Sequence, residues 1–398
     1  MKKLLKCFLI LTFLSIFLFN CDFVYAEKWP VYARHGMVVS TDRIASEVGV
    51  QILKKGGNAI DAAVATGFAL AVVHPAAGNI GGGGFMVIRF ADGSTTAIDY
   101  REKAPLAAHE KMYLDENGEL IKGLNHNSYF AIGVPGTVAG LTLALEKYGT
   151  MKLKDVIKPA IKLAEKGFPV SYAFHRDLVA NKERFEKYPA SARKFLKKDG
   201  SPFQPGEIFK QKDLAETLKR ISKKGRDGFY KGKTAELIAS DMQANGGLIT
   251  NKDLAAYQPV IRKPIEITYR GYTITGMPPP SSGGITLSII LNILEGYELT
   301  ELGHNSAAYI HLVAESMRKG FADRAHYLGD PDFNEDMPVQ WLISKKHAEE
   351  LRKTIDLTKA SQSGPDNFEW SAESSETTHY SVVDAEGNAV SNTYTIEA

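Results

Sequence analysis

Residues 59–73 are rich in alanine and apolar on nearly every side, and this segment restricts the possible folds more than any other feature. Apolar residues all round a helix indicate that the helix is buried. Asn58 stands before the segment as an N-cap, and His74-Pro75 ends it. We therefore expect a buried helix over 59–73.

Strand patterns follow this helix. The glycines at 81–84 precede an apolar run at 85–90, and Asp92-Gly93 is a hairpin turn before a return strand. A second strand–turn–strand pattern begins at Thr378, with its turn at 385–388. Helical pairs combined with hairpins indicate an α/β (α+β) layered fold rather than a doubly wound sheet.

Apolar periodicity predicts further elements along the 398 residues, a length that allows one large domain or two to three smaller ones. Helices are expected over 38–53, 136–148, 153–165, 285–294 and 307–328, and a strand pair over 265–277. The segment 361–375 is polar, contains Gly, Pro and Ser, and lacks periodicity, which is typical of a flexible connection with accessible backbone.

The segment 1–26 has the composition of a signal peptide. Lys2, Lys3 and Lys6 precede an apolar run over 7–19, and Val24-Tyr25-Ala26 places small residues before a cleavage position. We expect export to the periplasm or the medium, with an uncleaved N-terminal anchor as the alternative. The three lysines and Asp22 give this segment the whole +2 formal charge of the chain.

The rest of the chain therefore carries no net charge, which gives no support for nucleic-acid binding. Both cysteines, Cys7 and Cys21, lie in the signal peptide, so the mature protein has no disulfide and no thiol nucleophile. The ten histidines show no metal-ligand spacing, and the glycines at 81–84 lack the Gly-Lys-Ser/Thr of a phosphate loop. We expect no metal and no cofactor.

The segment Glu376-Thr377-Thr378-His379-Tyr380-Ser381-Val382-Val383-Asp384, followed by Gly387 to Thr395, closely resembles the processing site of the γ-glutamyltranspeptidases, also called glutathione hydrolases. The resemblance implies that the proenzyme cuts its own chain between Glu376 and Thr377 and that Thr377 becomes the nucleophile. By itself, a Thr-Thr-His run is typical of an ordinary strand start.

A new N-terminal Thr has a chemical advantage over an internal one. An unaided Thr hydroxyl is a poor nucleophile and needs a base. A terminal α-amine, with a pKa of roughly 7.7–8, is partly neutral at physiological pH and belongs to the same residue. Cleavage of a precursor is a way to create this pair of groups.

Other residues match the family's functional positions. Arg101, in Asp99-Tyr100-Arg101-Glu102-Lys103, resembles the Arg that binds the substrate α-carboxylate, for which a guanidinium is well suited. Thr395 matches a Thr that supports the nucleophile, and Glu397 a residue that contacts the substrate α-amine. Without the resemblance, Arg101 would be a surface Arg paired with Asp99 or Glu102, and Thr395 an ordinary strand residue.

His379 shares a strand face with residue 377, so a supporting role is geometrically allowed, with a hydrogen-bonded structural His as the alternative. The resemblance extends over about residues 35–397. It implies the αββα sandwich of the N-terminal nucleophile hydrolases, with 27–376 as a large subunit and 377–398 as the start of a small subunit. The remaining small-subunit residues are absent here, so the fold is expected to be incomplete and this chain inactive alone.

The resemblance implies γ-glutamyl transfer from glutathione and other γ-glutamyl compounds to water or to amino acid or peptide acceptors. The reaction would proceed through a γ-glutamyl-Thr377 acyl-enzyme, in a heterodimer cut from one precursor. One alternative is a glutaryl or cephalosporin acylase of the same fold, for which Glu397 would have little purpose. Another is an inactive exported fragment, which predicts no cleavage before Thr377.

Overall fold

The computed structural model describes residues 30–363 and 377–396. The chain divides into two units, one ending at Arg34 and one running from His35 onward. The elements below all belong to the second unit, and the signal peptide predicted at 1–26 lies outside the described residues.

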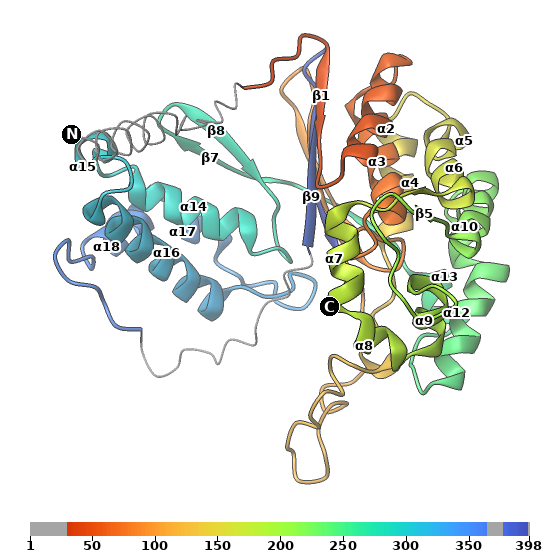
Figure 1. The fold of residues 1–398 in the computed structure, drawn as a ribbon. Coiled ribbons are helices and arrows are strands. Elements are labelled where there is room, and N and C mark those ends of the chain that lie inside the picture. Colours follow the sequence, from red (N-terminus) through yellow and green to blue (C-terminus); the bar gives the residue numbers. More distant parts are fainter. Residues whose placement is uncertain (1–29, 364–376, 397–398) are drawn as a thin grey trace, which may run out of the picture. The chain divides into compact units, whose positions relative to one another are not determined.

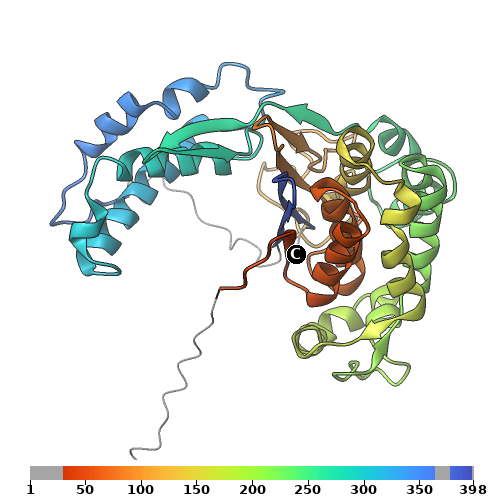
Figure 2. The same ribbon diagram turned by 90° about the horizontal axis from the view of Figure 1, so that it is seen from above.

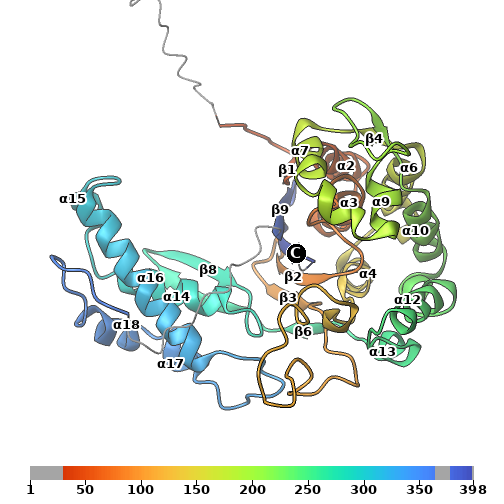
Figure 3. The same cartoon turned by 60° about the horizontal axis from the view of Figure 1, so that its bottom comes forward.

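A six-stranded antiparallel sheet combines strands from both ends of this unit. Figures 1 and 3 show the last strands beside the first ones, with blue β9 next to β1. The strand order is β1-β9-β10-β2-β3-β6. The strands are β1 (Gly36–Val39), β2 (Gly83–Arg89), β3 (Thr95–Asp99), β6 (Val260–Arg262), β9 (Thr377–Asp384) and β10 (Ala389–Thr395).

The inner face of this sheet packs on α2 (Arg43–Lys54) and α3 (Ala59–Val73). All of α3 is buried, and Asn58 and Asp61 form a capping box at its start. Two buried tyrosines form long-range hydrogen bonds at the sheet. The Tyr394 hydroxyl of β10 donates to Gly67 O of α3 at 2.8 Å, and the Tyr100 hydroxyl donates to Asn392 Oδ1 of β10 at 2.7 Å.

A second layer of helices covers α3 on the side away from the sheet. It includes α5 (Leu153–Val156), α6 (Lys158–Lys166) and α10 (Lys212–Lys224), whereas α4 (Thr137–Tyr148) packs on α3 and also on the sheet strands β2 and β3. In Figure 2 the yellow and green helices lie outside the red α2 and α3. The sheet, α3 and this outer layer share one hydrophobic core.

A smaller core forms around β7 (Ile265–Tyr269), β8 (Tyr272–Gly276) and the helices that follow. Its buried residues are Ile265, Ile285, Ile289, Ile293, Leu342 and Ala348. The helices are α14 (Gly283–Leu294), α15 (Leu299–Leu302), α16 (Ala307–Tyr327), α17 (Val339–Leu342) and α18 (Lys345–Arg352). Helix α14 packs on α16, α17 and α18, and these elements are labelled together in Figure 1.

The remaining elements connect these layers. They are the 3₁₀ helix η1 (Tyr129–Ala131), β4 (Phe168–Pro169), α7 (Tyr172–Ala180), α8 (Lys182–Glu186), α9 (Pro189–Phe195), β5 (Ile208–Phe209), α11 (Asp227–Tyr230), α12 (Lys233–Ala244) and α13 (Asn251–Ala256). Phenylalanine side chains pack between β4, β5, α7 and α9.

Most of the predicted elements are confirmed close to their expected bounds. These are the buried helix at 59–73, both hairpins, and the elements at 136–148, 265–277, 285–294 and 307–328. The helix predicted over 38–53 is wrong at its start. The segment 36–39 forms β1, which pairs with β9, and Asp42 caps the helix by accepting from the Ile44 and Ala45 amides. The helix predicted over 153–165 is two helices, because Pro159 stands in the first turn of α6.

Candidate active site

Four residues lie in one row across the end of the sheet. Thr377, the first residue of β9, pairs with Thr395 of β10, and Thr395 pairs with Gly83 of β2. Gly84 and Tyr100 exchange both backbone hydrogen bonds, at 3.3 and 3.0 Å, which places Arg101 opposite Gly83. The row therefore consists of Thr377, Thr395, Gly83 and Arg101, in that order.

The row faces the side of the sheet opposite to α3. Along β9, Thr378, Tyr380, Val382 and Asp384 are buried, whereas Thr377 and His379 are exposed. Because residues directly opposite each other in a sheet point to the same face, the Thr395 side chain lies beside that of Thr377. Thr378 points inward, where its hydroxyl is 2.8 Å from the hydroxyl of Thr41.

The glycines explain how backbone approaches this row so closely. A side chain on Gly82 would place a Cβ 2.1 Å from the Thr395 carbonyl oxygen. Asn79 Oδ1 accepts from the Gly82 amide at 2.7 Å and from the Thr137 hydroxyl at 2.8 Å. These buried contacts fix the glycine run against the end of β10.

Arg101 is held through its backbone, and the residue as a whole is exposed. Its amide donates to Asp99 Oδ1 at 3.1 Å, and its carbonyl accepts from the Tyr257 hydroxyl at 2.8 Å. Burial raises the pKa of Tyr257, so the hydroxyl stays protonated and able to donate. The guanidinium carbon lies 5.8 Å from the centre of the Phe85 ring, on the same face of the sheet as Thr377.

Arg262 supports the same corner from a distant part of the sequence. Its Nε donates to Asp99 Oδ2 at 2.8 Å, and its terminal nitrogens are 3.3 Å from the Asp332 carboxylate. Neither Arg262 nor Tyr257 was predicted as a site residue. No local pattern marks them, because they reach Asp99 and Arg101 only when β6 pairs with β3.

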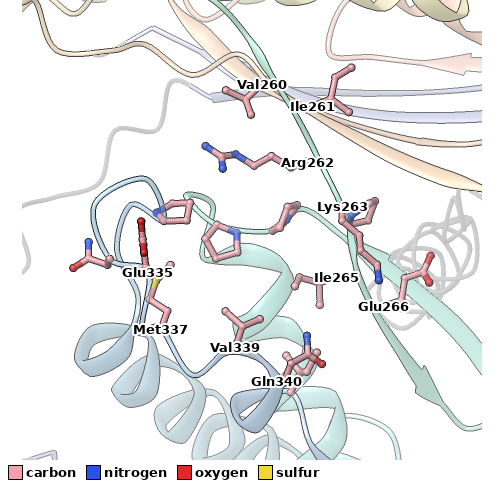
Figure 4. Close-up of a pocket in the computed structure, with 16 residues that line it drawn as sticks. Val260, Ile261, Arg262, Lys263, Ile265, Glu266, Glu335, Met337, Val339 and Gln340 are labelled. Carbon is pink, nitrogen blue, oxygen red and sulfur yellow. The ribbon is translucent and has the colours of Figure 1, made fainter.

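A cavity of about 650 Å³ opens beside Arg262, between β6, β7 and the loop before α17 (Figure 4). Its lining includes Lys263, Glu266 and Glu335. Glu266 Oε1 accepts from the Thr95 hydroxyl at 2.8 Å, which ties this wall to β3.

His379 contacts hydroxyls of neighbouring strand residues. Its Nδ1 is 2.7 Å from Thr393 Oγ1, and its Nε2 is 3.2 Å from Ser381 Oγ and 3.4 Å from Ser391 Oγ. Burial lowers the pKa of His379. These contacts fit a hydrogen-bonded histidine of the outer sheet face, further along β9 from Thr377.

Glu376 and Glu397, predicted to flank the scissile bond and to contact substrate, lie outside the described residues. Within residues 30–363 and 377–396, no group of three or more His, Cys, Asp or Glu side chains is arranged to hold a metal ion. In the same part of the chain, no helix is both long and apolar enough to cross a membrane.

Comparison with solved structures shows which class this fold belongs to. The structure aligns with a γ-glutamyltranspeptidase of Helicobacter pylori at a TM-score of 0.81 and 49% identity, covering 86% of this chain and 100% of that one. A cephalosporin acylase of Bacillus halodurans aligns at a TM-score of 0.80 and 28% identity, over 94% of this chain and 68% of that one. The fold is that of the N-terminal nucleophile hydrolases, as predicted.

Sequence relatives narrow the class. A family model described as gamma-glutamyltranspeptidase matches residues 45–398. A glutathione hydrolase proenzyme of Pseudomonas sp. strain A14 is 51% identical over 98% of this chain and 67% of its own length. The corresponding Escherichia coli K12 proenzyme is 50% identical over 92% of this chain and 63% of its own length. The chain belongs to the γ-glutamyltranspeptidase family, and it spans about two thirds of the length of these relatives.

Proposed function

We propose that the protein catalyses γ-glutamyl transfer from glutathione or similar γ-glutamyl compounds to water or to an amino acid or peptide acceptor. The observation that carries this proposal is the row formed by Thr377, Thr395 and Arg101 on one face of the sheet. This row combines a hydroxyl nucleophile, a second hydroxyl beside it and a carboxylate-binding cation.

The first step is cleavage of the bond between Glu376 and Thr377, which gives Thr377 a free α-amine. The amine takes the hydroxyl proton as Oγ1 attacks the γ-carbonyl carbon of the donor. The Thr395 hydroxyl supports the nucleophile from the neighbouring strand. The proton then passes to the leaving amine as the γ-amide bond breaks, and a γ-glutamyl ester of Thr377 remains.

Water or an amine acceptor then attacks the ester carbonyl and releases Thr377, so the kinetics are ping-pong. Arg101 binds the α-carboxylate of the γ-glutamyl group. Three strand spacings separate the backbones of Thr377 and Arg101, roughly 14 Å. An extended Arg side chain and a bound glutamyl group can bridge that distance end to end, with the reactive carbonyl at Thr377 and the carboxylate at the guanidinium.

We also propose export by the N-terminal segment and a mature heterodimer of two pieces from one precursor. The identities favour a γ-glutamyl donor over the acylase alternative, because the glutathione hydrolase proenzymes are 51% and 50% identical to this chain and the acylase relatives are 42% and 28% identical. Export agrees with the basic and apolar composition of the segment 1–26.

Substitution of Thr377 tests the proposal. In protein expressed from its own complete coding sequence, Thr377→Ala should leave the chain uncut. It should also abolish release of the coloured nitroaniline from a γ-glutamyl nitroanilide. Thr377→Ser keeps a hydroxyl and should retain cleavage and measurable turnover. Thr378→Ala is the control, since that side chain points to the opposite face toward Thr41. Cleavage and turnover by Thr377→Ala would refute the assignment.

A further inference from the structure

The charges of this chain are distributed unevenly, although they cancel outside the signal peptide. Residues 152–233 contain twenty-two Lys and Arg but only ten Asp and Glu, whereas residues 234–398 contain twelve Lys and Arg and twenty-three Asp and Glu. The segment from α5 to α11 is therefore strongly basic. A total charge near zero does not exclude a surface of one sign on one part of a molecule.

Helix α6 carries a stripe of positive charge on its exposed side. Lys158, Lys162 and Lys166 follow one another at intervals of four residues, and all three are exposed, whereas Ala160 and Ala164 are buried. Like charges at this interval repel each other and destabilise a helix, and a Glu in the middle position would stabilise it. The stability of α6 therefore does not explain the stripe.

Helix α10 carries a second stripe beside the first. Lys212, Lys219 and Lys223 are spaced by seven and four residues, so they lie on one side of α10. Helix α10 packs on α6, and Lys219 Nζ donates to Glu165 Oε1 of α6 at 2.8 Å, which joins the two stripes. We call these six lysines of α6 and α10 the basic face.

The carboxylates nearby leave most of this charge uncompensated. The segments 152–167 and 210–225, which hold α5, α6 and α10, contain eleven Lys and Arg and four Asp and Glu. Three of the four carboxylates already form salt bridges. Glu165 and Glu216 share Lys219, both at 2.8 Å, and Asp213 pairs with Lys194 of α9 at 2.8 Å. Much of the positive charge is thus available to an external anion.

We propose that the basic face binds the anionic headgroups of a lipid bilayer. Lysine is a compact, hydrated point charge on a flexible stem, which suits attraction to many headgroups without a fixed geometry. The segments 152–167 and 210–225 contain no Phe, Tyr or Trp, the residues that stack on nucleic-acid bases or insert into the bilayer interface. The face therefore binds by charge, on the surface of the headgroups.

The position of the basic face leaves the candidate active site accessible. Helices α5, α6 and α10 cover α3 on the side away from the sheet, and α6 and α10 lie side by side beyond α3 in Figure 3. The row that begins at Thr377 faces the opposite side of the sheet. A molecule bound through the basic face would therefore turn this row away from the bilayer. The proposed export would bring the protein to a lipid surface, but the binding does not require the proposed reaction.

Sedimentation with vesicles tests the proposal on protein expressed from its complete coding sequence. At low ionic strength the wild type should sediment with vesicles of phosphatidylcholine and phosphatidylglycerol but not with phosphatidylcholine alone, and added salt should release it. Each lysine near an anionic surface contributes about fivefold to binding, so Lys158→Gln, Lys162→Gln and Lys166→Gln combined should lower the partition coefficient about 100-fold.

Two further variants separate the basic face from net charge. Arginine at the same three positions of α6 keeps the charge and should keep the partition coefficient within about twofold of the wild type. Lys122→Gln, Lys346→Gln and Lys359→Gln combined remove the same charge from exposed positions outside α5, α6 and α10. Because salt screens charges beyond about 10 Å, this variant should lose less than about threefold. An equal loss in the two glutamine variants would show an effect of net charge alone and overturn the basic face.

Two outcomes with the wild type would also overturn the proposal, whatever the substitutions do to folding. One is a wild type that sediments no better with the phosphatidylglycerol vesicles than with phosphatidylcholine alone. The other is tighter binding to a DNA duplex than to these vesicles at the same ionic strength, which would assign the face to nucleic acid. Circular dichroism and the urea unfolding midpoint show that the glutamine variants are folded, so that a lost interaction reports on the lysines.

Discussion

At the scale of single residues, the site depends on side chains whose backbones are fixed by partners far away in the sequence. Arg101 was predicted as a site residue from its local motif, and its role stays a prediction. The contacts that orient it, from Tyr257 and from Asp99 with its partner Arg262, were not predicted. A pattern of residue types marks a guanidinium but carries no information about which distant hydroxyl will accept or donate beside it.

Arg101→Lys tests the carboxylate-binding role. Lysine keeps the charge but loses the planar pair of donors, and hydrogen bonds to charged groups contribute about 1.5–3 kcal/mol. We expect kcat/KM for a γ-glutamyl anilide to fall about 10- to 100-fold. Arg89→Lys, at the far end of β2 and exposed, should change kcat/KM little. An unchanged kcat/KM in Arg101→Lys would remove Arg101 from the proposed mechanism.

At the scale of elements, the β9–β10 hairpin is joined to α3 by one buried carboxylate. Asp384 Oδ2 accepts from the Ala59 amide at the start of α3 and from the Asn388 side chain, both at 2.8 Å. Its Oδ1 accepts from the amides of Glu386 and Asn388 inside the turn. Asp384 thus shapes the turn and satisfies a helix N-terminus at the same time.

Asp384→Ala should lower the free energy of unfolding by about 2–4 kcal/mol, because it leaves buried donors without an acceptor. Urea unfolding followed by circular dichroism measures this change. Glu386→Ala, an exposed substitution in the same turn, should stay within about 0.5 kcal/mol of the wild type. Equal unfolding midpoints for the two variants would contradict the joining role of Asp384.

Local patterns predicted these elements unevenly, and for physical reasons. The helix at 59–73 has a cap, an apolar surface all round and a proline after its end, so several local rules agree. The segment 36–39 has no such local support. It forms a strand because β9, near the other end of the chain, offers backbone partners to it. Propensity within the window 38–53 therefore predicted a helix that begins too early.

At the scale of the whole molecule, the sheet is built from pairings of very high sequence separation. Strand β9 lies between β1 and β10, and β10 lies between β9 and β2. Layers of helix and sheet were predictable from periodicity, but the strand order follows only from the assembled structure. The fold of the N-terminal nucleophile hydrolases was predicted from the family resemblance, because periodicity alone does not identify a fold.

The proposed processing predicts the masses of the mature protein. Isolated from its natural source and denatured, it should give a large piece that ends at Glu376 and a second piece that begins at Thr377. Intact mass spectrometry resolves both termini, and the Thr377→Ala protein provides the uncut reference. A single species that retains the bond between Glu376 and Thr377 would contradict the processing and the mechanism that depends on it.

The interior position of β9 has a consequence for the order of events in maturation. Thr377 takes its position in the sheet only after the chain has been synthesised past β10. Strand β9 must then pair with β1, and β10 with β2. If the bond before Thr377 is then cut, the new terminus is already paired with β10 at Thr395, and the far half of β9 is paired with β1 as well. Cleavage would therefore report that folding is complete, and the two products would stay together without a covalent link.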